Sequence, residues 1–562
     1  MRDEERVWKV SQIDEEAGER LCRALGMPLL LARLLVARGI SSPDGARRYL
    51  SPALADFLDP YLLADMERAV RRINRAISSG ERVTVVGHED TDGLTGTVVL
   101  LEILRKMGAE ADYYLPSRVE EGHGLSRRAI ARAKQRGSAL IVTVDCGVTD
   151  SHPVAEAGRN GIDVIVLDHH EVIAPLPSAV AVVDPKRPDS AYPFRGLAGV
   201  GVAFKTAQAL VAGADRGPRA EWEQVAPDLL ELVLLGSIAD RVPLCDENRV
   251  AAVLGLKAFE ATERIGLQAL KHGLKGEEDR DLRAMELVQG SISLIASARS
   301  EDGGNDGCEL LLTHDSASAG TVVTKLRKES ERWHAAARAS FDRVLKMLDR
   351  EIDEPIIILV NEEIPYYLLG HCASRLRKLY MRPAILIGKR GAGLAGEARG
   401  PKWFDLMECL ATSDELLESW GGHKGAAGFS LSRDRLPAFS DRVRAYAAER
   451  IDPVDLQEIL RIDIEVGEGE LGPDLIKVLA ALRPYGEGNP APLLLARTVD
   501  VTSQGPRCVV KAGGDSISLI DERRRSSWTD LSGRPLQLDI VFTLGDSDEL
   551  LLVDCRPTFL NE

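Results

Sequence analysis

Apolar runs that end in Asp, Glu and His residues recur between residues 80 and 170. They are Val83 to Gly87 before His88-Glu89-Asp90-Thr91-Asp92-Gly93, Leu140 to Val144 before Asp145-Cys146-Gly147, and Val164 to Leu167 before Asp168-His169-His170. Continuous apolar runs are typical of parallel strands that are buried on both faces. Because ligands gather at the carboxyl ends of such strands, the pattern predicts side chains that converge at one edge of a sheet.

The rest of the chain changes character several times. Helical patterns fill Glu15 to Leu25, Pro28 to Arg38 and Asp65 to Ser78, and strands and helices then alternate from Arg82 to about Glu260. Such alternation indicates a parallel α/β sheet. A second α/β unit begins at Pro355, with strands expected at Ile356–Val360 and Ala384–Ile387. We therefore expect domains at 1–75 (helical), 76–265 (first α/β unit), 266–352 (helical linker), 353–452 (second α/β unit) and 453–562 (β-rich).

Two patterns describe the linker and the C-terminal part. From Ser318 to Asp349 an apolar stripe, interrupted by Ser330, runs along a highly charged helix that is suited to bracing two domains. After Pro453 five short strand-like runs follow within about 100 residues, which predicts a small barrel. These runs are Leu493–Ala496, Cys508–Lys511, Ile517–Ile520, Leu538–Phe542 and Leu550–Val553.

The composition indicates the cellular compartment but does not indicate a function. The net charge of −16 does not by itself favour a nucleic-acid partner, although basic residues still cluster locally, as between Arg127 and Arg136. The eight cysteines show no CxxC pairing, which fits a reducing compartment. The sequence also shows no apolar run of membrane-spanning length and no secretory signal. We expect a cytoplasmic protein without a membrane partner.

The polar residues after the strands have the composition of a metal site. A single Asp behind a strand is often a turn residue or a helix cap, and a His-His pair is often only hydrogen-bonded. Three such groups in order, followed by Asp240 behind the apolar segment Leu234–Ala239, favour a metal centre instead. A mixed His and Asp ligand set suits Mn²⁺ better than Mg²⁺, although Mg²⁺ remains possible.

With these groups in view, the chain resembles the DHH phosphoesterases, and among them the RecJ-like exonucleases specific for single-stranded DNA. The likeness runs nearly end to end. Its further segments are Arg38–Ile40 with Asp59-Pro60, Pro116–Leu125, Leu197–Lys205, Gly421–Phe429 and Leu482–Pro490. The resemblance implies a Rossmann-like DHH domain with a parallel sheet, a long connecting helix, an α/β DHHA1 domain and a C-terminal OB-like barrel.

The resemblance also implies a function and roles for the residues. It implies hydrolysis of single-stranded DNA from the 5′ end towards the 3′ end, in DNA repair and recombination, with two divalent cations. His88 and Asp90 would hold one cation; Asp92, His169 and Asp240 would hold the other, and Asp145 would bridge them. Asp168 would orient its neighbours, and His170 would face the scissile phosphate as a charge stabiliser or proton donor. Partners would be single-stranded DNA, with RNA possible, and a helicase or single-strand binding protein.

Candidates for binding the 5′ phosphate lie in two places. Gly421-Gly422-His423 reads as the start of a glycine-rich loop whose backbone N–H groups can approach a phosphate closely. Arg118 and Arg399 are suited to bidentate phosphate contacts. For all of them the alternatives stay open, because glycines also simply turn a chain and many arginines only lie on a surface.

The sequence departs from the RecJ pattern mainly outside the expected ligand set. His88 stands where RecJ proteins usually carry Asp, and His123 replaces an expected Tyr. Gly396-Glu397-Ala398-Arg399-Gly400 replaces Gly-Ser-x-Arg-Ser, so a carboxylate enters the phosphate site unless it pairs with Arg399. These departures leave open an alternative phosphoesterase of short oligonucleotides, RNA or cyclic dinucleotides. A scaffold without catalysis is disfavoured, because every expected ligand is present.

Overall fold

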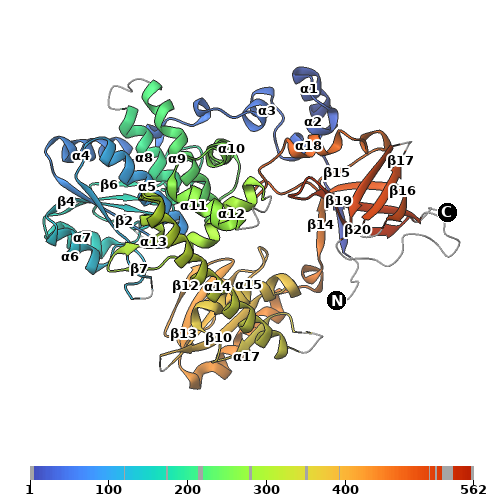
Figure 1. Cartoon of the computed structure of the whole chain (residues 1–562). Coiled ribbons are helices and arrows are strands. Elements are labelled where there is room, and N and C mark those ends of the chain that lie inside the picture. Colours follow the sequence, from blue (N-terminus) through green and yellow to red (C-terminus); the bar gives the residue numbers. More distant parts are fainter. Residues whose placement is uncertain are drawn as a thin grey trace. The chain divides into compact units, whose positions relative to one another are not determined.

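The computed structural model describes residues 6–118, 120–172, 175–212, 219–276, 282–348, 352, 354–391, 393–504, 507–512, 515–521 and 536–558. The chain divides into two compact units (Figure 1). One is built from residues 10–329 and 462–562, and the other from residues 330–461 with the N-terminal segment up to Lys9. The first unit therefore joins distant parts of the sequence.

A five-stranded parallel sheet forms the centre of the first unit, in the order β3-β2-β4-β5-β6. The strands are β2 (Arg82–Gly87), β3 (Ala111–Tyr114), β4 (Ser138–Val144), β5 (Asp163–Leu167) and β6 (Ala181–Val183). The expected apolar runs thus form strands with the expected carboxyl ends. The α/β class predicted from the sequence is confirmed.

Alternate residues of these strands enter two different hydrophobic cores, one on each face of the sheet. Val142 and Ile165 pack with α5 (Thr91–Lys106), α8 (Gly199–Ala212) and α9 (Arg219–Ala239). Ile141 and Val166 pack with α6 (Arg127–Gln135) and α7 (Ser151–Arg159) on the other side. Because both faces are covered, the strands need apolar residues at every position, which explains their unbroken runs.

Further helices extend this unit. They are α4 (Met66–Ser78), α10 (Asp246–Glu260), α11 (Ile265–Lys275), α12 (Ala284–Ile295) and α13 (Asp306–Leu312), with a short hairpin of β7 (Ser300–Glu301) and β8 (Gly304–Asn305). No helix among the described residues is long and apolar enough to cross a bilayer.

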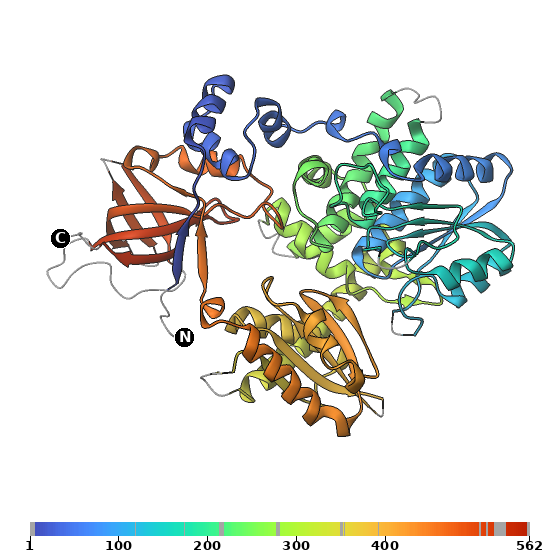
Figure 2. The ribbon, with the colours of Figure 1, turned by 180° about the vertical axis from the view of Figure 1, so that it is seen from behind.

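A β-barrel with its own core forms the C-terminal part of the same unit (Figure 1, and Figure 2 from behind). Its strands lie in the order β15-β16-β17-β18-β20-β19, and pairing of β16 with β19 closes the sheet. Their bounds are β15 (Ile464–Glu465), β16 (Leu494–Gln504), β17 (Arg507–Ala512), β18 (Asp515–Ile520), β19 (Leu536–Leu544) and β20 (Leu550–Pro557). The predicted barrel is confirmed.

The N-terminal helices share the core of this barrel. They are α1 (Glu15–Leu25), α2 (Leu29–Ala37) and α3 (Pro43–Leu50), and α18 (Leu475–Ala480) joins them. Leu34 and Leu35 of α2 belong to the same buried cluster as Ile540 and Phe542 of β19. The two ends of the chain therefore fold together, which the sequence pattern did not predict.

The other unit contains a mixed sheet in the order β12-β13-β11-β10-β9. Its elements are β9 (Ile357–Val360), α15 (Tyr366–Tyr380), β10 (Ala384–Arg390), β11 (Gly393–Arg399), α16 (Leu406–Ala411), β12 (Ser419–His423), β13 (Ala426–Leu431) and α17 (Leu436–Arg450). β1 (Val7–Val10) pairs with β14 (Ile459–Ile462) as a separate ribbon.

The long charged helix expected from Ser318 onwards is α14 (Ser316–Lys346). Its first half places Val323 and Leu326 in the core of the first unit, and its second half places Phe341 and Val344 in a core of the second. Asp349, the expected end of the helix, lies outside the described residues. One continuous helix thus belongs to both units.

Candidate metal centre

Four elements deliver the predicted ligands to one place. His88, Asp90 and Asp92 follow β2, Asp145 follows β4, and Asp168, His169 and His170 follow β5. Asp240 follows α9 rather than a strand, so the apolar segment before it is helical. The structure brings together three groups whose ligand atoms lie within 4.8 Å of one another: His88–Asp90–Asp145, Asp92–His169–Asp240 and Asp145–His169–His170.

Asp145 lies at the centre of this arrangement and belongs to two of the groups. Its side chain is 3% exposed; Oδ2 lies 3.8 Å from His88 Nδ1, and Oδ1 lies 3.0 Å from His169 Nε2. The backbone there is left-handed, with φ at 61°. This conformation is unfavourable for a residue with a side chain and is typical of functional sites. The strand end thus turns the carboxylate to face both histidines.

The N-terminus of α8 fixes Asp92. The backbone N–H groups of Gly199 and Val200 donate hydrogen bonds of 2.7 and 2.8 Å to its two carboxylate oxygens. Glycine is required at this approach, since a Cβ on Gly199 would lie 2.5 Å from the Cβ of Asp145. The segment Leu197–Lys205 therefore lets a helix end approach two of the candidate ligands at once.

The buried carboxylate of Asp168 accepts hydrogen bonds from the residues around it. One oxygen accepts hydrogen bonds from the His169 N–H and from Nδ1 of His170, at 2.8 and 2.7 Å, and the other accepts from the Val148 N–H at 2.9 Å. Its side chain is 1% exposed, whereas that of His170 is 48% exposed. Asp168 thus holds the ring of His170 and the backbone at His169, and leaves the His170 side chain half exposed.

The pKa values of the two histidines move in opposite directions. Burial lowers the pKa of His169 to about 4, so its ring is neutral near pH 7 and has a lone pair for a metal. The hydrogen bond with Asp168 raises the pKa of His170. The two adjacent histidines therefore differ in protonation: burial favours the neutral ring of His169, and the bond to Asp168 favours the protonated ring of His170.

The carboxylates of the centre lie close together, and no lysine or arginine among the described residues forms an ion pair with them. Burial and the charges of neighbouring carboxylates raise the pKa of Asp92 and of Asp145 well above the ordinary value, and that of Asp240 to about 6. In the part of the chain that the structure describes, their ion-pair partners are histidines, and the buried Oδ1 of Asp145 forms no hydrogen bond. Such a set of oxygen and nitrogen donors fits divalent cations, which supply the missing positive charge.

Comparison with known proteins identifies the family. A model of the N-terminal domain of the DHH family matches residues 82–237, and a DHHA1 domain model matches residues 353–449. The single-stranded-DNA-specific exonuclease RecJ of Bacillus subtilis is 34% identical over 87% of this chain, which spans 61% of that protein. RecJ of Dickeya dadantii is 33% identical, and the match covers 83% of each chain. The chain belongs to the RecJ family.

A solved structure supports the family assignment. RecJ of Thermus thermophilus in complex with Mn²⁺ superimposes with a TM-score of 0.78 at 27% identity, covering 99% of this chain and 80% of that one. A Mg²⁺ complex of the same protein also matches, with a TM-score of 0.73. The family thus includes members whose structures hold divalent cations.

Further residues of this RecJ-family protein lie next to the predicted ligands and contact them or their neighbours. His123, which the sequence marked only as a departure, lies 3.1 Å from His88 through Nδ1 and Nε2. Glu89 accepts hydrogen bonds from the backbone N–H groups of Arg118 and Ser300, at 2.9 and 2.6 Å. Arg118 itself is exposed on the loop that carries His123. Glu89, a residue without a predicted role, thus anchors two segments beside the centre.

The remaining phosphate candidates lie in the DHHA1 unit. Arg399 of β11 donates to Glu397 at 2.9 Å, so the unusual carboxylate does pair with the arginine. The expected loop at Gly421, Gly422 and His423 is wrong: these residues form strand β12, and the turn to β13 comes after them. Their glycines resemble a loop in the sequence, but pairing with the apolar strand β13 makes them a strand. Gly422 has φ at 144° and would clash with Ala426 if it carried a Cβ.

The register of this sheet relates these residues. Arg399 pairs with Ala426, and Ala426 pairs with His423, so the three share one rung and one face. Glu397, Gly428 and Gly421 share the next rung on that face. The glycines leave space beside the Arg399–Glu397 pair.

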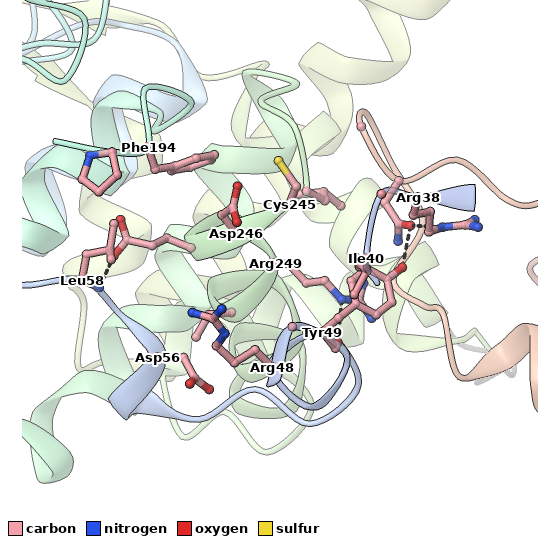
Figure 3. Close-up of a pocket in the computed structure, with 18 residues that line it drawn as sticks. Arg38, Ile40, Arg48, Tyr49, Asp56, Leu58, Phe194, Cys245, Asp246 and Arg249 are labelled. Carbon is pink, nitrogen blue, oxygen red and sulfur yellow. Dashed lines mark hydrogen bonds between the residues drawn. The ribbon is translucent and has the colours of Figure 1, made fainter. Parts of the chain in front are cut away.

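A cavity of about 470 Å³ lies elsewhere in the first unit, among α3, α10 and the Leu482–Pro490 segment (Figure 3). Arg38, Arg48 and Arg249 line it together with Asp56 and Asp246. Its charges are mixed in sign, and it contains none of the candidate metal ligands. We interpret it as a packing gap between elements of this unit rather than as a second functional site.

Proposed function

We propose that this protein is a metal-dependent exonuclease that hydrolyses single-stranded DNA from the 5′ end towards the 3′ end, in DNA repair and recombination. The observation that carries the proposal is the convergence of His and Asp ligands at the carboxyl edge of a DHH sheet in a RecJ-family chain. The curated relatives are named single-stranded-DNA-specific exonucleases.

The ligand groups support two cation positions. His88 and Asp90 would hold one cation, Asp92, His169 and Asp240 the other, and Asp145, which belongs to two groups, would lie between them. Two such cations supply a nucleophilic water and neutralise charge on the phosphate. The histidines in both positions favour Mn²⁺ over Mg²⁺, because Mg²⁺ prefers oxygen ligands.

His170 is suited to proton transfer at the scissile phosphate. Its ring is half exposed, and the hydrogen bond with Asp168 favours the protonated form. A protonated imidazole stabilises developing negative charge and can donate a proton to a leaving oxygen. Asp168 holds the ring in place and keeps its proton available.

The other parts of the chain support binding of a DNA strand. Arg399 in the DHHA1 unit and Arg118 beside the centre would contact phosphates, and the barrel would provide stacking and a charged groove for single-stranded DNA or RNA. A helicase or a single-strand binding protein would supply the strand in the cell. A barrel and a connecting helix have no evident use in an enzyme of dinucleotides.

Digestion of a 3′-labelled single-stranded DNA of about 40 nucleotides with Mn²⁺ tests the proposal. We expect a ladder that shortens from the 5′ end, and no cleavage of blunt duplex. Asp145→Asn should abolish cleavage. Asp163→Asn is the matched control, since Asp163 lies 51% exposed at the amino end of β5, away from the centre.

Other outcomes would contradict the proposal. Cleavage that persists in Asp145→Asn would place the activity elsewhere or in a contaminant. An intact long strand beside rapid hydrolysis of two- to five-nucleotide oligomers would assign the protein to the alternative class that acts on short substrates.

A further inference from the structure

Two imidazole rings meet edge to edge beside the candidate metal centre. Nε2 of His88 lies 3.1 Å from Nδ1 of His123, the ring centroids are 5.3 Å apart, and the ring planes differ by 16°. The centroid separation exceeds the N···N distance by about one ring width, so the rings lie end to end and nearly coplanar. In this arrangement an N–H of one ring points along the lone pair of the other, as a strong hydrogen bond requires.

The position of His88 decides which ring donates. Its Nδ1 faces the ligand group, 3.0 Å from Asp90 Oδ2 and 3.8 Å from Asp145 Oδ2. A histidine that offers Nδ1 to a cation carries its proton on Nε2. With a cation at Nδ1, Nε2 of His88 would donate and Nδ1 of His123 would accept, and His123 would carry its own proton on Nε2.

The loop around His123 is fixed on both sides. Before it, Glu121 accepts hydrogen bonds from the Ser117 N–H at 3.1 Å and the Ser126 hydroxyl at 2.5 Å. After it, Gly124 has φ at 84°, and a Cβ there would lie 2.3 Å from Asp150. Asp150 accepts the Leu125 N–H at 2.6 Å. The loop therefore holds His123 against His88 in a defined position.

We propose that His123 is a positioning residue that orients His88 towards its cation and increases the basicity of the ligating nitrogen. A partner on the outer nitrogen commonly has this effect on a metal-ligating histidine. The role is specific to a histidine at position 88, because a carboxylate there has no N–H to donate. The two departures from the RecJ pattern, His88 and His123, thus act as a pair. The inference rests on the proposed function only in that the centre binds divalent cations.

Mn²⁺ titration of the metal-free protein, followed by the electron paramagnetic resonance of free Mn²⁺, tests this pairing without any nuclease assay. We expect His123→Phe to weaken one of the Mn²⁺ sites by about tenfold. His123→Asn should restore most of the affinity, because the side-chain amide oxygen of Asn can take the place of Nδ1 as acceptor. Thermal unfolding of each metal-free variant verifies that the fold is retained.

A double-mutant cycle makes the test specific. In a His88→Asp background, His123→Phe should leave Mn²⁺ affinity unchanged. Equal losses in both backgrounds, no loss in the single variant, or no recovery with Asn would each overturn the pairing. Normal Mn²⁺ binding with the expected coupling but no DNA cleavage would instead refute the proposed function and leave the pairing intact.

Discussion

The Asp184 carboxyl shows how burial near the centre affects stability. Its side chain is fully buried, one oxygen accepts the Lys186 N–H at 2.7 Å, and the other lacks a partner among the described residues. Burial raises the pKa of Asp184 to about 7, and the nearby Asp168 contributes to the rise. Between about pH 4 and 7 the unfolded chain has lost this proton and the folded protein keeps it. Stability should therefore fall as the pH rises through this window.

Asp184→Asn should remove this pH dependence. The free energy of unfolding of the variant and of the unchanged protein is measured at each pH by urea unfolding with a chelator present. We expect the difference, variant minus unchanged protein, to be about 1–3 kcal/mol larger at pH 8 than at pH 5. Asp500→Asn, which alters an exposed carboxylate in the same unit, serves as the control. A difference that is the same at both pH values would show that Asp184 titrates normally.

The Glu397 carboxylate should weaken recognition of a 5′ phosphate, because it occupies the guanidinium of Arg399. Glu397→Gln removes the competing charge, so we expect the KM for a 5′-phosphorylated strand to fall by about threefold to tenfold. The KM for a 5′-hydroxyl strand should stay the same. Glu362→Gln, which breaks an exposed pair with Arg433 in the same unit, is the matched control. Equal effects on both strand ends would refute a phosphate contact at Arg399.

At the scale of elements, the close approach of α8 to the strand ends is required for the ligand geometry. Gly199→Ala would place a Cβ 2.5 Å from the Cβ and 2.9 Å from the Cα of Asp145, so the helix must shift. We expect Mn²⁺ affinity to fall by at least about tenfold, with a loss of about 1–3 kcal/mol in stability. Calorimetric titration and urea unfolding measure the two effects.

Gly201→Ala is the matched control for this helix. Gly201 lies two residues after Gly199 in the same helix, and its Cβ would meet the flexible side chain of Leu197, at 3.3 Å. We expect little change in either quantity. Equal losses of Mn²⁺ affinity and stability in both variants would show that α8 tolerates no added side-chain volume at either position. Gly199 would then have no specific role at the metal centre.

Elements with a strong local pattern could be predicted from the sequence, and those that depend on distant partners could not. The strand ends at Gly87, Val144 and Leu167 follow from their apolar runs. The strand expected at Leu493–Ala496 instead continues to Gln504, because a bulge at Arg497 and Thr498 lets a polar pair lie inside it. Strand β12 was also missed, since its formation depends on β13 rather than on its own glycines.

The same distinction applies to the candidate site. The groups after the strands predicted seven residues that the structure brings together, because a parallel sheet places its carboxyl ends at one edge. The eighth, Asp240, joins them from the end of helix α9. The contact between His88 and His123 depends on a loop whose path no periodicity reveals. Two unusual histidines near expected ligands were the available signal.

At the scale of the whole first unit, Arg249 of α10 links the parallel-sheet domain to the segment that leads into the barrel. Its guanidinium is buried and lies 3.5 Å from the centre of the Tyr49 ring (Figure 3). It donates to the carbonyls of Tyr49, Leu482 and Arg483. The Tyr49 hydroxyl in turn donates to Asn489 at 2.7 Å. One side chain thus joins α3, α10 and the segment that leads into β16.

Arg249→Met should loosen this junction while both cores stay folded. The carbonyls of Tyr49 and Arg483 lose the Arg249 donor, whereas that of Leu482 still accepts from Asn489. We expect a loss of about 2–4 kcal/mol and a calorimetric transition that separates into two. Arg48→Met is the control, because Arg48 lines the same cavity but is exposed. If the barrel binds the strand, the KM for a 40-nucleotide substrate should rise in Arg249→Met, whereas that for a five-nucleotide oligomer should not. A single transition with an unchanged KM for the long substrate would contradict this role of Arg249. It would mean that other contacts hold the barrel in place.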